Sequence, residues 1–314
     1  MHLQTSIMID LIVLGAAAGG GFPQWNSNAE GCRRARSGDP LAPARTQASI
    51  AISGDGEEWF VVNASPDLRQ QINQTPALHP KTGLRSTPIA GVILTGAEVD
   101  TITGLLTMRE RQPFEILATR QVLDQLDANP IFEAVNRSVV TRKEFPLDES
   151  IALTKSDGTP AGLSVTAFAV PGKVPLYAEK GANPAEIVEN GETVGLEITD
   201  GKHRTLFIPG CACMNDRLRA RLKDADLVLF DGTLWTDDEM IKAGLGEKTG
   251  KRMGHMSVND TDGTIAAFRD LNVQRKVFIH INNSNPILLA DTPERAETEA
   301  AGWEVSYDGM RITL

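Results

Sequence analysis

The stretch LTGAEVDTITGLLTMRE, residues 94–110, decides how the fold of this chain is interpreted. It follows the apolar run GVI, which predicts a buried β-strand, and it leads into the periodic pattern of a helix. In open α/β folds, ligand sites form where strands end in this way. Asp100 is therefore a candidate metal ligand, and Glu98 could place a second carboxylate beside it. The competing interpretation is that Asp100 caps the helix that follows.

Short apolar runs punctuated by glycine recur along the 314 residues, and helical patterns lie between them. Runs such as DLIVLG (10–15) and ADLVLFDG (225–232) predict strands that are covered on both faces. Ser65 and Thr292, each followed by proline, predict helix starts. No linker rich in Ser, Gly and Pro divides the chain. The sequence therefore predicts one α/β domain over residues 1–314, with two packed sheets and outer helices, in which residues 173–193 form a long surface loop or lid.

The composition limits the function classes. A formal net charge of −10 argues against binding to nucleic acid or to anionic membranes. No apolar stretch reaches the roughly 20 residues that span a membrane, and the N-terminal segment lacks the basic start and the cleavage site of a signal peptide. Three cysteines do not suggest a disulfide framework. We expect a cytoplasmic protein without membrane insertion.

Two histidines and one aspartate in the C-terminal part of the sequence are further candidate site residues. His280 ends the predicted strand KVFIH and leads into a turn in which Asn282 and Asn283 either orient a ligand or build the turn. Asp231 ends the strand LVLFD, where a turn explains the sequence equally well. His255 lies in the segment RMGH, and its role stays ambiguous.

The cysteines and an early glycine-rich loop suggest two further sites. Cys211 and Cys213 could bind zinc with Cys32 as a third thiolate, although such cysteines are more often packed small residues. The loop GAAAGGGFPQWN (15–26) departs from a nucleotide-binding G-x-G-x-x-G motif, because no helix opens directly after its glycines. We expect it to wind around a ligand pocket instead. Its predicted contacts are Gly19, Gly20 and Gly21, with Phe22 and Trp25 as walls.

The segments GGGFPQWN, NASPDLRQQI, FDGTLW, RMGH and HINNSNPIL occur in this order and resemble the coenzyme PQQ synthesis protein B (PqqB) family of the metallo-β-lactamase superfamily. The resemblance spans essentially the whole chain. It implies an αβ/βα sandwich of two mixed sheets flanked by helices. It also implies a role in the synthesis of pyrroloquinoline quinone (PQQ), in which a Glu–Tyr crosslinked precursor is processed to the quinone.

The chain departs from the family at its metal motifs. Of the His-x-His-x-Asp-His loop of metal-dependent hydrolases only Asp100 is present, and Thr101 stands where the family has histidine. Of the structural zinc knuckle of the family only Cys32 remains, which His255 could help to complete. The resemblance leaves Asp100 and His280 as candidate catalytic residues around a weakened iron or zinc centre. The candidate metal ligands are Asp100, His280, Asp231, Cys32, His255 and Cys211.

The resemblance leaves several functions open. The first is binding and handling of PQQ or its precursor, including transport towards the periplasm, with Arg45, Arg69 and Arg109 as candidates for holding an acidic ligand. The second is an iron- and oxygen-dependent hydroxylase of the precursor. A zinc hydrolase is disfavoured by the missing histidines, and a metal-free pathway paralogue is the remaining alternative. Other PQQ-pathway proteins and a second copy in a homodimer are the expected partners.

Overall fold

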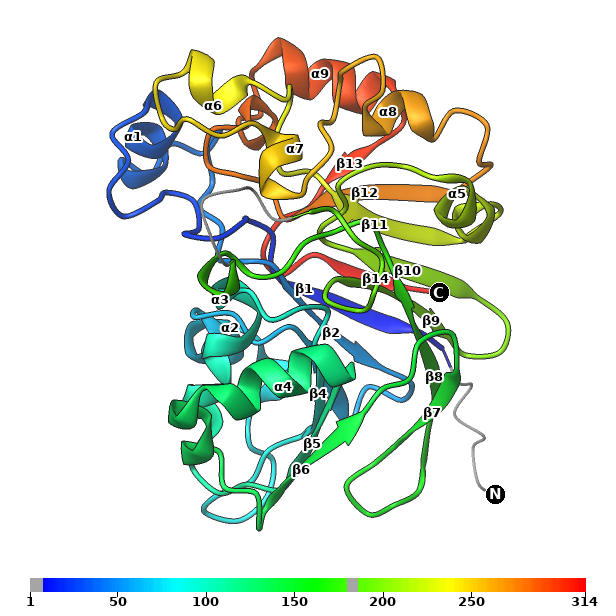
Figure 1. Cartoon of the computed structure of the whole chain (residues 1–314). Coiled ribbons are helices and arrows are strands. Elements are labelled where there is room, and N and C mark those ends of the chain that lie inside the picture. The colour runs from blue at the N-terminus through cyan, green and yellow to red at the C-terminus, as the bar shows by residue number, and fades with distance from the viewer. Residues whose placement is uncertain (1–7, 180–185) are drawn as a thin grey trace.

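Two seven-stranded sheets pack face to face in this computed structural model, which describes residues 8–179 and 186–314 (Figure 1). In spatial order, the first sheet contains β14 (Arg311–Thr313), β1 (Asp10–Gly15), β2 (Ser49–Ser53), β3 (Trp59–Val62), β4 (Ile89–Ile93), β5 (Phe114–Ala118) and β6 (Val140–Glu144). The second contains β13 (Glu304–Val305), β12 (Arg275–Ile279), β11 (Leu227–Asp231), β10 (Arg204–Ile208), β9 (Val194–Thr199), β8 (Pro160–Ala169) and β7 (Ser150–Thr154).

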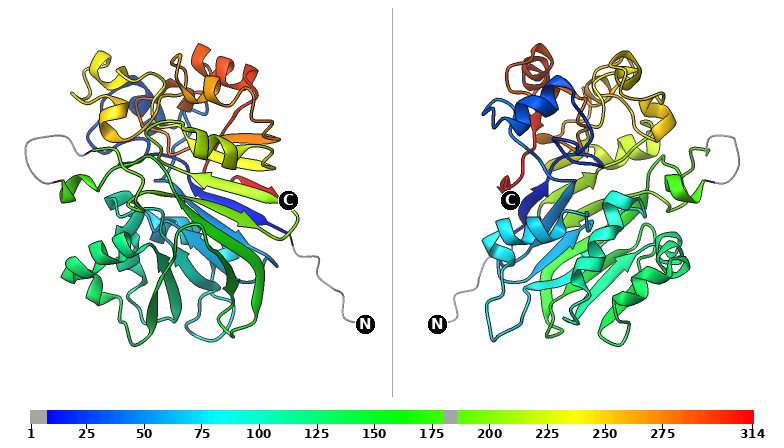
Figure 2. Two further views of the ribbon diagram at one scale, coloured as in Figure 1. Left: turned by 45° about the vertical axis from the view of Figure 1, so that its right-hand side comes forward. Right: turned by 90° about the vertical axis from the view of Figure 1, so that its left-hand side faces the viewer.

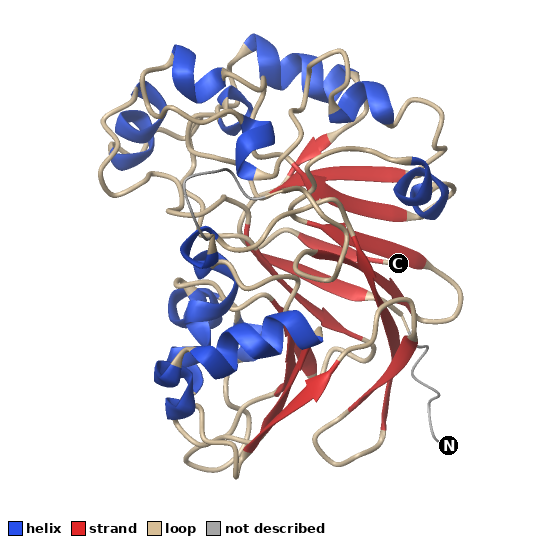
Figure 3. Ribbon diagram, in the orientation of Figure 1, coloured by secondary structure: helices blue, strands red, loops and turns tan. Residues whose placement is uncertain are grey.

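Both sheets follow the same plan. From β14 to β3 and from β7 to β10 all neighbours are antiparallel, whereas from β3 to β6 and from β10 to β13 all are parallel. Helices cover the outer face of each sheet (Figure 3). The predicted sandwich of two mixed sheets between helices is therefore confirmed.

The helices form two groups on opposite sides of the sandwich (Figures 1 and 2). The first sheet carries α2 (Leu68–Gln74), α3 (Val99–Ile102) and α4 (Arg120–Ala128), with the 3₁₀ helices η1 (Pro76–Leu78), η2 (Thr103–Met108) and η3 (Pro130–Ala134). The second group contains α1 (Glu30–Arg36), α5 (Asp216–Leu222), α6 (Glu239–Lys242), α7 (Gly250–Met253), α8 (Thr264–Ala267) and α9 (Pro293–Ala300). Two further 3₁₀ helices are η4 (Leu176–Ala178) and η5 (Pro286–Leu288).

Successive side chains of a strand contribute alternately to the core between the two sheets and to the core beneath the outer helices. In β11, Leu227 and Leu229 belong to the core between the sheets, whereas Val228 and Phe230 belong to the core beneath the outer helices. Successive side chains of a strand point to opposite faces, so a strand that is buried on both sides is apolar throughout. All five residues of β11 are buried, including the terminal Asp231. Burial on both faces explains why the central strands could be predicted from apolar runs.

Local differences from the sequence predictions concern edges and termini. The strands β6 and β7 were not predicted, because they lie at sheet edges and carry exposed polar residues. The predicted helix start at Ser65 is two residues early, since α2 begins at Leu68 and the Ser65 hydroxyl accepts a hydrogen bond from the Asp67 N–H (3.2 Å). The start at Thr292 is confirmed, with its hydroxyl accepting from the Arg295 N–H.

Part of the predicted loop 173–193 lies outside the described residues, namely 180–185. The described part contains η4 and a bridge between Gly172 and Val188. Within residues 8–179 and 186–314, no helix combines the length and the apolar character needed to cross a membrane.

Candidate functional site

A cavity of about 370 Å³ opens where strands of both sheets end. Loops after β1, β3 and β4 approach it from the first sheet, and loops after β11 and β12 approach it from the second. This is the edge at which α/β folds place ligand sites. Its polar lining includes Asn63, Thr95, Glu98, Asp100, Thr101, Lys173, Glu192, Thr233, Lys248, Arg252, His255, His280 and Asn282.

Asp100 and His280 meet at this cavity although 180 positions separate them in the chain. The Oδ2 atom of Asp100 lies 2.9 Å from Nε2 of His280. His280 follows β12 with a φ of 57°, a region that few non-glycine residues adopt, and this conformation directs the ring away from the path of the strand. The cap interpretation of Asp100 is wrong, because α3 begins at Val99 and its N-cap residue is Glu98.

Asp231 orients the ring of His255 through a contact with its Nδ1 atom. Its Oδ2 lies 2.7 Å from Nδ1 of His255 and accepts the N–H of Cys211 (3.0 Å). Its Oδ1 accepts the N–H and the hydroxyl of Thr233, at 3.0 and 2.6 Å. The Asp231 carboxylate is fully buried and makes four polar contacts with three residues, so it acts as a fixed support for the imidazole. The His255 backbone is set by Gly254, which ends α7 in the left-handed conformation (φ 90°).

The hydrogen bond between Asp100 and His280 shifts the pKa of each group towards its charged form. Burial raises the pKa of the Asp100 carboxyl, but the hydrogen bond and the charge of His280 outweigh it and bring this pKa below its usual value. Burial lowers the pKa of the His280 imidazole, yet the hydrogen bond to Asp100 and the nearby carboxylates outweigh it and raise this pKa. The contact therefore favours the carboxylate form of Asp100 and the imidazolium form of His280.

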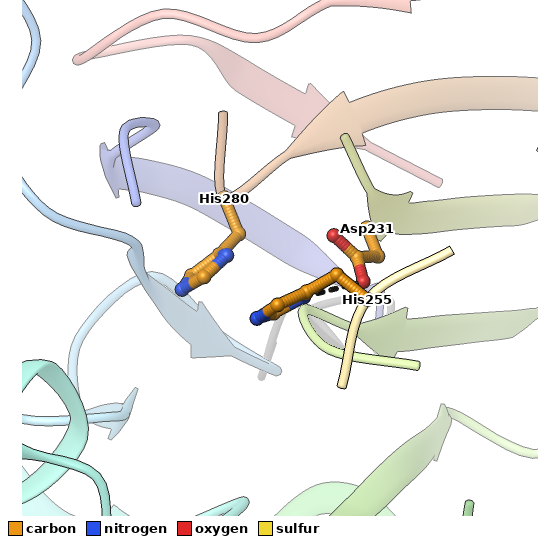
Figure 4. A group of neighbouring side chains, drawn as sticks. All are labelled: Asp231, His255 and His280. Atoms are coloured by element: carbon orange, nitrogen blue, oxygen red, sulfur yellow. Dashed lines mark hydrogen bonds and ion pairs between the residues drawn. The ribbon is translucent and has the colours of Figure 1, made fainter. Parts of the chain in front are cut away.

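Three of the predicted metal ligands form a cluster. The donor atoms of Asp231, His255 and His280 all lie within 4.8 Å of one another (Figure 4). The two imidazoles stack with ring centroids 5.1 Å apart and 18° between their planes. In Figure 4 the outer nitrogen of each ring points to the same side, away from Asp231. Two imidazoles, one of which contacts the Asp100 carboxylate, are donor groups that suit zinc or iron.

Cys32 and Cys211, which are among the candidate metal ligands, lie outside this cluster, and their assignment is corrected. Cys32 is buried in α1, where its thiol approaches the Asn283 amide oxygen at 3.6 Å. The thiol of Cys211 donates to the backbone carbonyl of Cys213 (3.2 Å), and burial raises its pKa well above the usual value. Metals bind the thiolate form, which this environment disfavours. Both side chains belong to the apolar core on the outer face of the second sheet.

Of the residues predicted to contact a ligand in the glycine-rich loop, only Gly19 lines the cavity. Gly19 lines the cavity, and a Cβ atom there would lie 3.5 Å from the Asp100 carboxylate, so this backbone approaches the ion pair closely. Gly20 and Gly21 turn the chain with φ of 91° and 71° and do not line the cavity. The prediction that Phe22 and Trp25 form pocket walls is wrong, because Phe22 is buried in the core and Trp25 is 86% exposed.

The two asparagines predicted to bind the ligand, Asn282 and Asn283, have different positions relative to the cavity. Asn282 lines the cavity, whereas Asn283 lies outside it and donates its side-chain amide to Gln24. This bond ties the turn after β12 to the glycine-rich loop. Asn283 therefore supports the loop, and the prediction of a direct ligand contact is corrected for it.

Several residues of the site were not predicted. Thr233 follows Asp231 by two residues, and the sequence FDGT could have drawn attention to its hydroxyl. Lys173 and Arg252 line the cavity, and Arg252 belongs to the RMGH segment that was noted only for its histidine. The arginines proposed to hold an acidic ligand do not line the cavity. Arg45 is buried and donates to the carbonyls of Pro43 and Ser306, and Arg69 and Arg109 are exposed.

Comparison with known proteins gives consistent relatives. The family model described as Beta-lactamase superfamily domain matches residues 58–281. The chain is 74% identical over 306 residues to coenzyme PQQ synthesis protein B of Gluconacetobacter diazotrophicus, covering 98% of this chain and 100% of that protein. It is 58% identical to the protein of the same name from Gluconobacter oxydans, covering 98% and 99%. The crystal structure of Zn²⁺-bound PqqB from Methylobacterium extorquens superimposes with a TM-score of 0.92 at 48% identity, covering 97% and 100%.

Proposed function

The chain belongs to the coenzyme PQQ synthesis protein B family of the β-lactamase superfamily, and from this premise we propose that it binds and handles PQQ or its tyrosine-derived precursor. The observation that carries the proposal is the cavity of about 370 Å³ at the Asp100–His280 pair. This volume falls in the range of roughly 300–1,000 Å³ typical of small-molecule sites. A few convergent polar groups in a pocket wall can fix the orientation of a planar ligand.

The donor chemistry of the cavity fits a metal ion. Asp100 and His280 would hold it, with the outer ring nitrogen of His255 as a third donor and Asp231 keeping that ring in place. The Zn²⁺ in the relative from Methylobacterium extorquens supports zinc as one occupant. A metal bound there supplies Lewis acidity and, if it is iron, redox chemistry. In this structure the hydrogen bond between Asp100 and His280 holds the two donor atoms 2.9 Å apart.

The second candidate function is an iron-dependent hydroxylase, because of the number and type of metal ligands that the cavity offers. Two imidazoles and one carboxylate form the set that leaves open positions on ferrous iron in oxygen-dependent enzymes. In this chain His255, His280 and Asp100 would form that set, because Asp100 contacts His280 and the two imidazoles stack. The side chain that stands at position 101 is threonine, which lines the cavity without offering a nitrogen donor. Two other functions are also proposed, namely a metal-free role in the pathway and transport towards the periplasm. For the location we propose the cytoplasm. As partners we propose other proteins of the pathway and a second copy of this chain in a homodimer.

Metal analysis of anaerobically purified protein separates these functions. Stoichiometric iron that is lost in Asp100→Ala and His280→Ala variants is expected for the hydroxylase. Tight binding of PQQ by metal-free protein, measured by calorimetry, is expected for a carrier. If neither a metal nor PQQ binds, ligand handling at this cavity is refuted and the metal-free paralogue is left. His203, which contacts Asp200 outside the cavity, offers a matched His→Ala control.

A further inference from the structure

The cluster of Asp231, His255 and His280 surrounds a single hydroxyl group. The Oγ1 atom of Thr233 lies 2.6 Å from Oδ1 of Asp231. The same atom lies 2.9 Å from Nδ1 of His280 and 3.1 Å from Nδ1 of His255. The Thr233 side chain is buried, and its hydroxyl fills the space between the three donor atoms. A metal ion therefore cannot bind on the Nδ1 side of the two rings without displacing this hydroxyl.

Backbone hydrogen bonds hold Thr233 beside the turn that carries His280. The N–H of Asn282 donates to the Thr233 carbonyl (3.0 Å), and the N–H of Gly232 donates to the Ile279 carbonyl (2.8 Å). These two bonds join the segment after β11 to the segment after β12. The position of the hydroxyl relative to the His280 ring is therefore set by the fold and does not depend on a bound ligand.

The single proton of the Thr233 hydroxyl decides the direction of its contacts. The Asp231 carboxylate gives the shortest contact and is charged, whereas the His280 carbonyl lies at 3.0 Å and is neutral. Thr233 therefore donates to Asp231, and its oxygen is left to accept. In the contact at 2.9 Å the proton then belongs to Nδ1 of His280. The other ring nitrogen, Nε2, lies 2.9 Å from Asp100 and is the one that can give up its proton to bind a metal.

We propose that Thr233 is a positioning residue that keeps a proton on Nδ1 of His280 and thereby directs Nε2 of this ring towards a metal ion beside Asp100. This inference rests on the proposed function, because it concerns the metal that the cavity would hold. Asp231 has the corresponding effect on His255, whose Nδ1 lies 2.7 Å from its carboxylate. Thr233 acts through His280 and is not itself a metal ligand.

Zinc binding to the full chain, measured by competition with a chelating dye, tests this role. Thr233→Val should weaken zinc binding about 10- to 100-fold, which is the usual cost of removing the partner of a metal-binding histidine. Thr233→Ser keeps the hydroxyl and should bind zinc within about threefold of the wild type. The matched control is Thr205→Val, which should leave zinc binding unchanged. Thr205 is buried in β10, its hydroxyl has no partner among the residues that the structure describes, and it does not line the cavity.

Nitrogen NMR of zinc-loaded protein reports the position of the proton and needs no variant of Thr233. The chain has five histidines, so labelling histidine with ¹⁵N gives a spectrum with few signals. With zinc bound, His280 should have a protonated Nδ1 and a metal-bound Nε2 in the wild type and in Thr233→Ser. A protonated Nε2 and a metal-bound Nδ1 in the wild type overturn the inference, even if Thr233→Val does not fold.

The outcomes separate this inference from the proposed function. Equal zinc affinities of the wild type and Thr233→Val overturn the role of Thr233, even if PQQ binds to the cavity. An equal loss of affinity in Thr233→Ser and Thr233→Val also overturns it, since the hydroxyl would then not be the group that matters. If zinc binding depends on the hydroxyl but PQQ does not bind in calorimetry, the positioning role stands and the proposed ligand is wrong.

Discussion

Glu239 is expected to make the stability of the protein fall between about pH 5 and pH 8. It is the first residue of α6, and one of its carboxylate oxygens accepts the N–H of Trp235 (2.6 Å). Its other oxygen is buried and has no hydrogen-bond partner among the described residues. Burial raises the pKa of this carboxyl from 4.5 to about 7. An unpartnered buried oxygen is tolerated more easily when the group is protonated and uncharged.

The sign follows from proton binding. Between pH 4.5 and about 7 the folded state binds this proton more tightly than the unfolded state, so rising pH favours unfolding. The difference corresponds to at most about 3 kcal/mol, reached above pH 7 and absent below pH 4.5. In a Glu239→Gln variant this contribution disappears, while all other titrating groups contribute as before.

Urea unfolding of wild type and Glu239→Gln at pH 5, 6, 7 and 8 measures the effect. The stability of the variant relative to wild type should rise by about 2 to 3 kcal/mol across this range. The matched control is Glu133→Gln, because Glu133 is exposed and pairs with Arg137 at the surface. A difference between wild type and Glu239→Gln that stays constant with pH refutes the reasoning, since it would mean that the carboxyl titrates alike in both states.

Two further predictions concern the site itself. Thr101→His adds an imidazole to the cavity wall beside Asp100 and should increase the zinc retained after dialysis, measured by elemental analysis, whereas unchanged uptake would count against a metal centre at this position. Asp231→Asn should lower the free energy of unfolding by about 3 kcal/mol in urea, because an amide N–H₂ would face the donors that the carboxylate now accepts. A loss below about 1 kcal/mol would show that Asp231 is not the support described.

The sequence contained enough information for the central strands and for the ends of those strands. The run Leu227–Asp231 is apolar until its last residue, and this pattern reports burial on both faces. Because β11 and β12 are parallel neighbours, Asp231 and His280 leave the second sheet at the same edge. Periodicity failed at the exposed edge strands β6 and β7, where few apolar residues mark the inward face.

By itself the sequence determined the layered fold and a short set of polar residues at strand ends. The tertiary structure alone decided that Asp100 turns to His280, that Asp231 turns inward to hold His255, and that Trp25 faces solvent. Local patterns follow burial along one strand, whereas these directions depend on backbone angles such as the φ of 57° at His280 and on how the two sheets pack. The same packing brings Arg252 and Lys173 to one carboxylate, which no spacing in the chain indicates.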